Sequence, residues 1–156
     1  MTLTLEIRPG DLDHPDVLQL LREHLGAMAE HSPAESIHAL PIARLSAPDI
    51  SFWCAWQGPA LAGCGALKEL SAFHGEIKAM RTATAYLRKG IAAQLLQHIT
   101  AEAKRRGYRE LSLETGSADA FLPAQTLYQK YGFDYCGPFA SYRADPFSVF
   151  MSKCLT

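Results

Sequence analysis

The spacing of apolar residues in the first part of the chain predicts a strand followed by a helix. Apolar and polar side chains alternate over residues 3–8, which is typical of a half-buried strand. Apolar residues then recur every three or four positions, as they do on the buried face of a helix. Asp13 is the expected N-terminal cap of this helix, with Pro15 in its first turn. The residues of the stripe are Leu18, Leu21, Leu25 and Met28.

The next part of the chain changes from helical to strand-like spacing. Ser32, with Glu35 three positions later, predicts the start of a short second helix. Three apolar runs follow at residues 50–56, 61–70 and 74–82, and a turn that contains Gly and Pro separates the first two. Because the runs are closely coupled along the chain, we expect them to pair as an antiparallel meander.

The second half of the chain alternates helices with strands. The longest predicted helix covers residues 89–106. A strand is expected at 111–114, a further helix at 123–131, and two closing strands at 133–136 and 147–153. The core stripe of the long helix is Ile91, Leu95, Ile99 and Ala103.

This order of elements predicts an α/β (α+β) fold in one domain over residues 1–156. The meander must be antiparallel, whereas a strand-helix-strand step places its two strands parallel. The central sheet is therefore expected to be mixed, with helices on both faces.

Composition narrows the class of protein. The chain is 48% apolar and 20% charged, which is ordinary for a soluble globular protein, and its net charge of -1 offers no basic excess for nucleic acid. No apolar stretch approaches the roughly 18 residues that span a bilayer, and the first residues lack the pattern of a signal peptide. None of the four cysteines forms a C-x-x-C pair, so we expect reduced cysteines, a cytoplasmic location and no metal.

The turn Leu87-Arg88-Lys89-Gly90-Ile91-Ala92 lies where a strand ends and the long helix begins. The first N–H groups of a helix lack internal partners and carry the positive end of its dipole, so an anion such as phosphate is their natural ligand. Gly90 lets the backbone approach such a ligand, and Arg88 and Lys89 add positive charge. The same residues also fit a solvated basic turn, and neither a Walker loop nor a dinucleotide fingerprint is present.

This turn resembles the pyrophosphate-binding motif [RQ]-x-x-G-x-[GA] of the GNAT superfamily of N-acetyltransferases, with Leu87 in place of Arg or Gln. Residues 76–82 resemble the fourth strand of that family, and Leu127-Tyr128-Gln129-Lys130-Tyr131-Gly132-Phe133 resembles its L-Y-x-x-x-G-F signature. The resemblance implies a mostly antiparallel central sheet of about seven strands. It also implies transfer of an acetyl group from acetyl-CoA to an amine, by direct attack in a ternary complex.

The resemblance also implies how the donor binds. Backbone groups of Met80 and Thr82 would pair with the pantetheine arm, and an amide near Met80 would polarise the thioester carbonyl. The amides from Leu87 to Ala92 would hold the pyrophosphate. Where many relatives carry an Asn, this chain has Phe121, so Phe121 packs against the cofactor or Ser117 supplies the polar contact. The implied donor-binding residues are Met80, Thr82, Leu87, Arg88, Lys89, Gly90, Ile91, Ala92, Ser117, Phe121 and Tyr128.

Two residues match the catalytic positions of the family. Tyr128 matches its general acid, because a phenol is able to protonate a departing thiolate. Glu76 matches a general base on the fourth strand, acting directly or through water. The simpler interpretations are that Tyr128 packs on the sheet and that Glu76 pairs with Lys78. The alternative bases are His24, His31 and His74.

Acceptor specificity is expected from the first two helices and the loop before the last strand. Glu35 would hold a cationic acceptor, whereas Arg81 or Arg143 would hold a carboxylate. The acceptor is therefore a small-molecule amine or amino-acid-like compound whose charge is left open. The alternative function is a non-catalytic acyl-CoA-binding regulatory module, and a homodimer is a further expectation. The candidate acceptor residues are Met28, His31, Glu35, Ser36, His38, Arg81, Tyr142 and Arg143.

Overall fold

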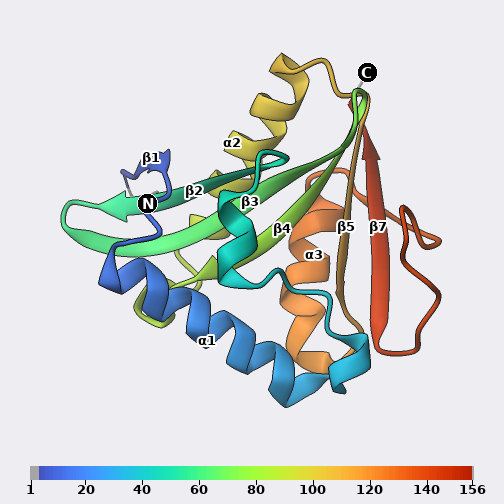
Figure 1. Cartoon of the computed structure of the whole chain (residues 1–156), viewed down its shortest axis with the longest axis horizontal. Helices are drawn as coiled ribbons and strands as arrows, with labels where there is room; N and C mark the ends of the chain where they lie inside the picture. The colour runs from blue at the N-terminus through green and yellow to red at the C-terminus, as the bar shows by residue number, and fades with distance from the viewer. Residues whose placement is uncertain (1–3, 156) are drawn as a thin grey trace.

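The structure, a computed structural model, describes residues 4–155 of the chain. Within them, seven strands form one sheet in the order β1-β2-β3-β4-β5-β7-β6 (Figure 1). The strands are β1 (Glu6–Pro9), β2 (Ile50–Gln57), β3 (Ala60–Ser71), β4 (His74–Thr82), β5 (Glu110–Gly116), β6 (Asp134–Cys136) and β7 (Ser148–Cys154). The α-helices are α1 (Pro15–His31), α2 (Ile91–Arg105) and α3 (Leu122–Lys130), and the 3-10 helices are η1 (Ala34–Ser36), η2 (Ile42–Ser46), η3 (Thr84–Tyr86) and η4 (Asp119–Phe121).

The sheet has the mixed pairing that the element order predicts. Strands β2, β3 and β4 pair antiparallel, which confirms the meander. Strand β5 lies parallel to β4, as expected across a strand-helix-strand step, and pairs antiparallel with β7. The mostly antiparallel, seven-stranded α/β fold is therefore confirmed.

Two predicted helix caps are wrong, and the short second helix is a 3-10 helix that begins after Pro33. The cap of α1 is His14, whose Nδ1 accepts a hydrogen bond from the Asp16 N–H, whereas Asp13 lies in the preceding turn, where its N–H donates to the Asp11 carboxylate. Ser32 ends α1 in an extended conformation instead of starting a second helix, since Pro33 disfavours helical geometry in the residue before it. Only the short η1 follows, and η2 was not predicted. Leu3, which the sequence assigns to the first strand, lies outside the described residues.

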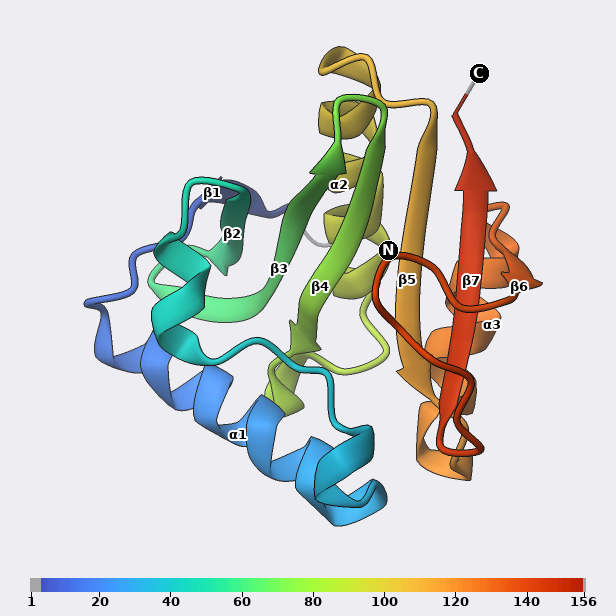
Figure 2. The ribbon, with the colours of Figure 1, turned by 45° about the vertical axis from the view of Figure 1, so that its right-hand side comes forward.

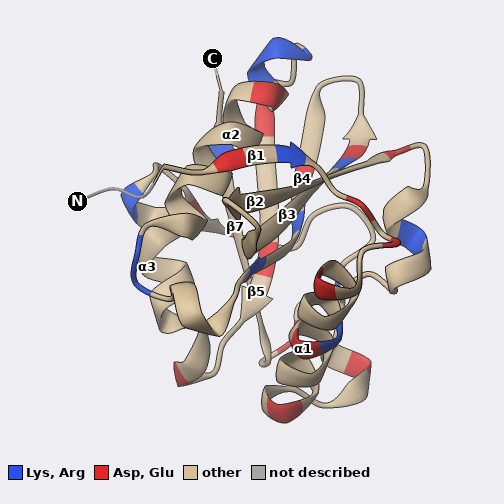
Figure 3. Ribbon diagram, turned by 90° about the vertical axis from the view of Figure 1, so that its left-hand side faces the viewer, with Lys and Arg blue, Asp and Glu red and all other residues tan. Residues whose placement is uncertain are grey.

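Helices cover both faces of the sheet (Figure 3). Helix α1 packs its buried side on β2 and β3, and α2 and α3 pack on the opposite face. No helix among the described residues is long and apolar enough to cross a membrane. The α1 layer contains Val17, Leu20, Leu21, Phe52, Cys54 and Cys64, and the α2–α3 layer contains Leu67, Ile77, Leu96, Ile99, Leu113, Tyr128 and Phe133.

Strands β4 and β5 are paired over only the first half of their length. Their pairing runs from His74 opposite Glu110 to Ile77 opposite Leu113 and then stops. Strand β4 continues to Thr82 on β3, and β5 continues to Gly116 on β7. The two strands therefore diverge toward the lower end of the view in Figure 2. Among residues 4–155, no strand lies beside this edge of β4 beyond Ile77.

A β-bulge lies in the unpaired half of β4. Ala66 of β3 is opposite Lys78 and Cys64 is opposite Arg81, so β4 has one more residue than β3 between these pairs. Ala79 adopts a left-handed φ of 54° there, which costs a non-glycine residue about 1–2 kcal/mol. The bulge changes the direction of the β4 backbone just beyond Ile77, where the pairing with β5 ends.

Candidate active site

A cavity of about 770 Å³ opens between the diverging strands. Its walls come from α1, the α1–β2 connection, β4, the start of α2, β5 and α3. Nine of the residues that the sequence assigns to the donor line it. They are Met80, Thr82, Leu87, Arg88, Gly90, Ile91, Ala92, Phe121 and Tyr128.

The N-terminus of α2 faces this cavity without a side-chain cap. Gly90 is the capping residue, with φ 82° and ψ 13°, and Arg88 before it also has a positive φ of 62°. The Gln94 N–H bonds the Gly90 carbonyl, so the earlier amides of the helix have no partner within it. Lys89 is not among the lining residues, and its ammonium group lies 5.5 Å from the ring centre of Tyr86. The turn therefore presents backbone N–H groups and one guanidinium to the cavity.

Tyr128 and Phe121 form the α3 side of the cavity. Tyr128 is only 7% exposed, packs its ring on Phe133, and makes no hydrogen bond through its hydroxyl to any described residue. Burial raises the pKa of Tyr128 to about 12, so its hydroxyl is protonated at neutral pH. Phe121 packs on Gly116, where a side chain would overlap its ring. Ser117 does not line the cavity, because its hydroxyl donates to the Pro146 carbonyl at 2.6 Å.

Glu76 lies beside the cavity in a buried network. It is 2% exposed, and its Oε2 accepts hydrogen bonds from the Lys78 ammonium at 3.0 Å and from the Tyr142 hydroxyl. Lys78 also donates to the Tyr142 oxygen at 2.8 Å and to the His38 carbonyl at 3.2 Å. Burial and the negative charge of Glu76 raise the pKa of Tyr142. Lys78 lines the cavity, but Glu76 does not. The hydrogen bonds of the network connect the segments that carry His38 and Tyr142 to β4.

Glu114 of β5 is a candidate site residue that sequence reasoning missed. It is half-buried and lines the cavity one residue beyond the last β4–β5 pair. Burial raises the pKa of Glu114, while the Ser148 hydroxyl and the charges of His38 and Lys78 favour its ionised form. The available signal was an acidic residue at the carboxyl end of a strand in a parallel pair, where ligands bind in α/β folds.

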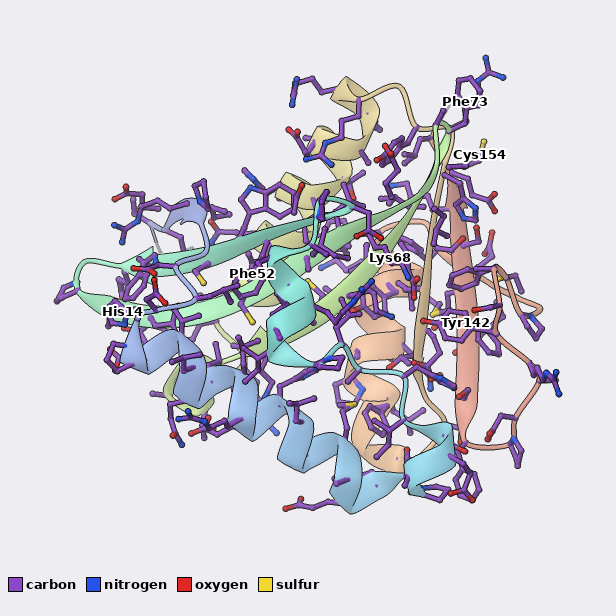
Figure 4. All side chains as sticks on the ribbon, in the orientation of Figure 1. His14, Phe52, Lys68, Phe73, Tyr142 and Cys154 are labelled. Carbon is purple, nitrogen blue, oxygen red and sulfur yellow. The ribbon has the colours of Figure 1, made fainter. Side chains whose placement is uncertain are left out.

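The expected acceptor residues divide between two hollows. A second hollow of about 420 Å³ lies beside the first, and His38 lines both. Tyr142 lies at the second, next to β7 and the chain that follows α1 (Figure 4). Ser36 is buried and donates to the Asp145 carboxylate at 2.6 Å. Met28, His31, Ser36 and Arg81 line the main cavity, and Glu35, Tyr142 and Arg143 line the second hollow.

The three histidines considered as bases have different surroundings. His74 contacts the Ser112 hydroxyl at 2.7 Å and does not line the cavity. His31 lines the cavity from the exposed end of α1 and packs against Phe121. His24 also lines it, and burial, with a smaller effect from the charge of Arg81, lowers the pKa of His24 to about 4. His24 is therefore neutral at pH 7.

Comparison with known proteins identifies the family. The model of the acetyltransferase (GNAT) family matches residues 15–133. The chain belongs to this family. One relative, the uncharacterized N-acetyltransferase YsnE of Bacillus subtilis, is 57% identical over 97% of this chain and 100% of its own length. The uncharacterized N-acetyltransferase YedL of Escherichia coli is 48% identical over 96% of this chain and 94% of its own length. An enzyme named IAA acetyltransferase, from Azospirillum brasilense, is 39% identical over 89% of this chain and 90% of its own length.

Solved structures share the GNAT fold along the whole chain. An acyl-CoA N-acyltransferase of Klebsiella pneumoniae superposes with a TM-score of 0.78 at 25% identity, over 98% of this chain and 99% of that one. The PaiA N-acetyltransferase of Thermoplasma acidophilum, solved with coenzyme A, gives a TM-score of 0.75 at 21% identity, over 97% of this chain and 99% of that one. The protein is therefore a GNAT-family acetyltransferase enzyme.

Neutral, buried His24 gives a testable pH dependence of stability. Its pKa is about 4 in the folded protein and about 6.5 in the unfolded chain, so the unfolded chain binds more protons between these values. Stability should therefore fall as the pH falls through this window, by about 2–3 kcal/mol more in the wild type than in His24→Gln. Urea unfolding of both proteins between pH 7.5 and 4 measures the difference. Parallel pH profiles would show that His24 titrates normally.

Proposed function

We propose that this GNAT enzyme transfers an acetyl group from acetyl-CoA to an amine, which attacks the thioester directly in a ternary complex. One observation carries the proposal. The free edge of β4, the uncapped N-terminus of α2 and Tyr128 all line a single cavity. These are the groups needed to hold a thioester on a long anionic carrier and to protonate its leaving thiolate.

In this proposal acetyl-CoA extends through the cavity from the turn at residues 87–92 to the β-bulge at Ala79. The pyrophosphate is placed at the amides from Arg88 to Ala92, where the α2 dipole and the Arg88 charge favour an anion. The pantetheine arm then follows the free edge of β4 past Thr82 and Met80, where it takes the place of a neighbouring strand. An amide at the bulge beside Ala79 is placed to stabilise the developing oxyanion.

Three proton transfers accompany the reaction. The acceptor nitrogen bonds to the acetyl carbon, and the carbon–sulfur bond breaks as the thiolate leaves. Tyr128 supplies a proton to that sulfur, because its raised pKa keeps the hydroxyl protonated. The acceptor ammonium must first lose one proton to a base, because only the neutral amine attacks. After the attack its nitrogen loses a second proton, which returns to the Tyr128 oxygen and restores the hydroxyl.

Glu114 is better placed than Glu76 to act as that base. The Glu76 carboxylate already accepts from Lys78 and Tyr142 and does not line the cavity. Glu114 lines the cavity, and its raised pKa brings its proton affinity closer to that of a useful base near neutrality. We therefore propose that Glu114 takes the proton, directly or through water, and that Glu76 holds Lys78 and Tyr142 in place.

The relatives support this function at different levels of detail. Those compared above are named acetyltransferases, which favours an enzyme over the non-catalytic acyl-CoA-binding module. A structural neighbour was solved with coenzyme A, which supports the choice of donor. The name IAA acetyltransferase refers to one acceptor of one relative, and this chain is proposed to act on a small amine. The homodimer stays a prediction.

The donor site is tested by two glycines at the ends of α2. Gly90 and Gly107 have φ values of 82° and 85°, and an added Cβ meets nothing within 4 Å at either position. Each change to Ala should cost about 1–2 kcal/mol of stability through backbone strain. Only Gly90→Ala places a methyl group at the proposed pyrophosphate, and it should weaken acetyl-CoA binding about tenfold in calorimetry. Equal acetyl-CoA affinities for the two variants would mean that the phosphates bind elsewhere. Absence of saturable acetyl-CoA binding to the wild type would show that acetyl-CoA is not the donor.

The acid is tested by a pair of tyrosines near the end of α3. Wild type should release free thiol from acetyl-CoA only when an acceptor amine is present. Tyr128→Phe should lower kcat about a hundredfold while acetyl-CoA affinity in calorimetry stays within a factor of two or so. Tyr131→Phe is the matched control, since Tyr131 does not line the cavity. Unchanged turnover in Tyr128→Phe would show that Tyr128 is not the general acid.

The base is tested by comparing the two glutamates. Glu114→Gln should lower kcat/KM about a hundredfold at pH 7.5 and remove the acidic limb of the pH profile. Because the pKa of Glu114 is raised, that limb in wild type should lie above the range of an ordinary glutamate. Glu76→Gln leaves the Lys78 charge without its carboxylate and should cost about 3 kcal/mol of stability, with the limb retained. A folded Glu76→Gln enzyme without the limb would return the role to Glu76.

A further inference from the structure

Arg81 extends from the bulged half of β4 toward α1. Met80 packs against the α2 side of the sheet, and successive residues of a strand point to opposite faces. Arg81 accordingly acts electrostatically on His24 of α1, and both residues line the main cavity. The guanidinium thus lies on the face of the sheet opposite α2.

The Arg81 guanidinium is half-buried and has no ion pair, hydrogen bond or ring contact within the part of the chain that the structure describes. Of the three other half-buried lysines and arginines among the described residues, Lys68 has no partner and lies outside the cavity, and the other two are paired. Lys78 pairs with Glu76, and Lys153 donates to the Tyr131 carbonyl at 2.7 Å. Removing a cation from water without an anion is unfavourable, so an anionic ligand at Arg81 would offset that cost.

His24, which also lines the cavity, has a second polar group without a hydrogen-bond partner among the described residues. Its Nδ1 is buried and has no hydrogen-bond partner among the described residues. A neutral imidazole has one N–H donor, and no described contact fixes which nitrogen carries the hydrogen. Nδ1–H is therefore able to donate to an anion that also contacts Arg81. Both groups line one cavity without a hydrogen-bond partner within residues 4–155, and in the Nδ1–H tautomer of His24 one anion would serve both.

The position of this pair favours the acceptor over the donor as the source of the anion. The donor phosphates already have the N-terminus of α2 and Arg88, and the pantetheine arm follows the edge of β4 that faces β5. Arg81 and His24 lie instead on the α1 side, where Met28 and His31 also line the cavity. Glu114, whose charge interacts with His38 and Lys78, offers an anionic group for the amine.

We propose that Arg81 and His24 bind a carboxylate of the acceptor, so that the substrate is an amino acid or another amine that also carries a carboxylate. The inference rests on the proposed acetyl transfer and adds the chemical class of its acceptor. The carboxylate accepts hydrogen bonds from the guanidinium and from the His24 imidazole, and the amine lies toward Glu114 and the thioester. Neutral amines lacking the carboxylate lose these contacts.

The test compares matched acceptors in the thiol-release assay with acetyl-CoA. The twenty standard L-amino acids, their primary carboxamides and the corresponding decarboxylated amines form the panel. The best acceptor should be a free amino acid, preferred over its carboxamide by about ten- to a hundredfold in kcat/KM. Arg81→Gln should remove that preference, mainly through KM, and Arg81→Lys should restore part of it. Arg44→Gln, on the exposed side of η2, is the control.

Calorimetry on the enzyme saturated with coenzyme A supplies a readout without turnover. The preferred amino acid should bind to the wild-type complex and bind at least about tenfold more weakly to Arg81→Gln and His24→Gln. Acetyl-CoA affinity should be the same in all three proteins. If Arg81→Gln weakens acetyl-CoA and leaves the acceptor preference intact, Arg81 belongs to the donor and the inference is wrong.

The remaining outcomes separate the inference from the proposed function. Carboxamides or simple amines that are used as well as free amino acids would overturn the carboxylate site and leave acetyl transfer standing. Absence of amine-dependent thiol release with every member of the panel, together with no binding of amino acids to the coenzyme A complex, would overturn both.

Discussion

Beyond Ile77 and Leu113, β4 and β5 no longer share hydrogen bonds, although each remains paired with its other neighbour. Backbone N–H and C=O groups in a protein interior require partners, and an unpaired strand edge is a template for another extended chain. The free edge of β4 supplies that template inside a cavity. The position of the donor, the thioester and the acceptor in our proposal all depend on this one interruption of the sheet.

Other features of the site carry a local cost that a ligand would offset. Ala79 is held at a positive φ, Arg88 places a cation at the positive end of a helix dipole, and Arg81 is half-buried without an anion. Each is unfavourable in the free protein. All three line one cavity, whereas the buried charges of Glu76 and Lys78 are paired with each other. Unfavourable local features concentrated in this way are typical of binding sites.

Much of the fold follows from the spacing of apolar residues. The meander and α2 are set by strong periodic patterns, and the turn from Leu87 to Ala92 is specified by the local chemistry of a helix start. The wrong caps at Asp13 and Ser32 reflect competition between neighbours: the Asp11 carboxylate engages Asp13, and Pro33 fixes the conformation of Ser32. Such choices between adjacent capping residues differ little in energy and are not visible in a pattern.

The site was less predictable because its partners come from distant segments. Tyr142 reaches Glu76 across 66 residues, and Ser36 reaches Asp145 across 109. The sequence offered the Glu76–Lys78 pair as one alternative, but it could not show that Tyr142 completes the network. Nor could it show that Glu114, in the second half of β5, lines the cavity. The left-handed Ala79 was equally hidden, since the bulge arises from the register of β4 on β3.

The central claim is that acyl-CoA binds along the free edge of β4 with its pyrophosphate on the first amides of α2. A titration of the ¹⁵N-labelled protein with coenzyme A, followed through backbone amide NMR signals, tests it most directly. The largest changes should occur at the amides from Met80 to Thr82 and from Arg88 to Ala93, and they should saturate together. Saturable binding that leaves both groups of amides unchanged would contradict the account.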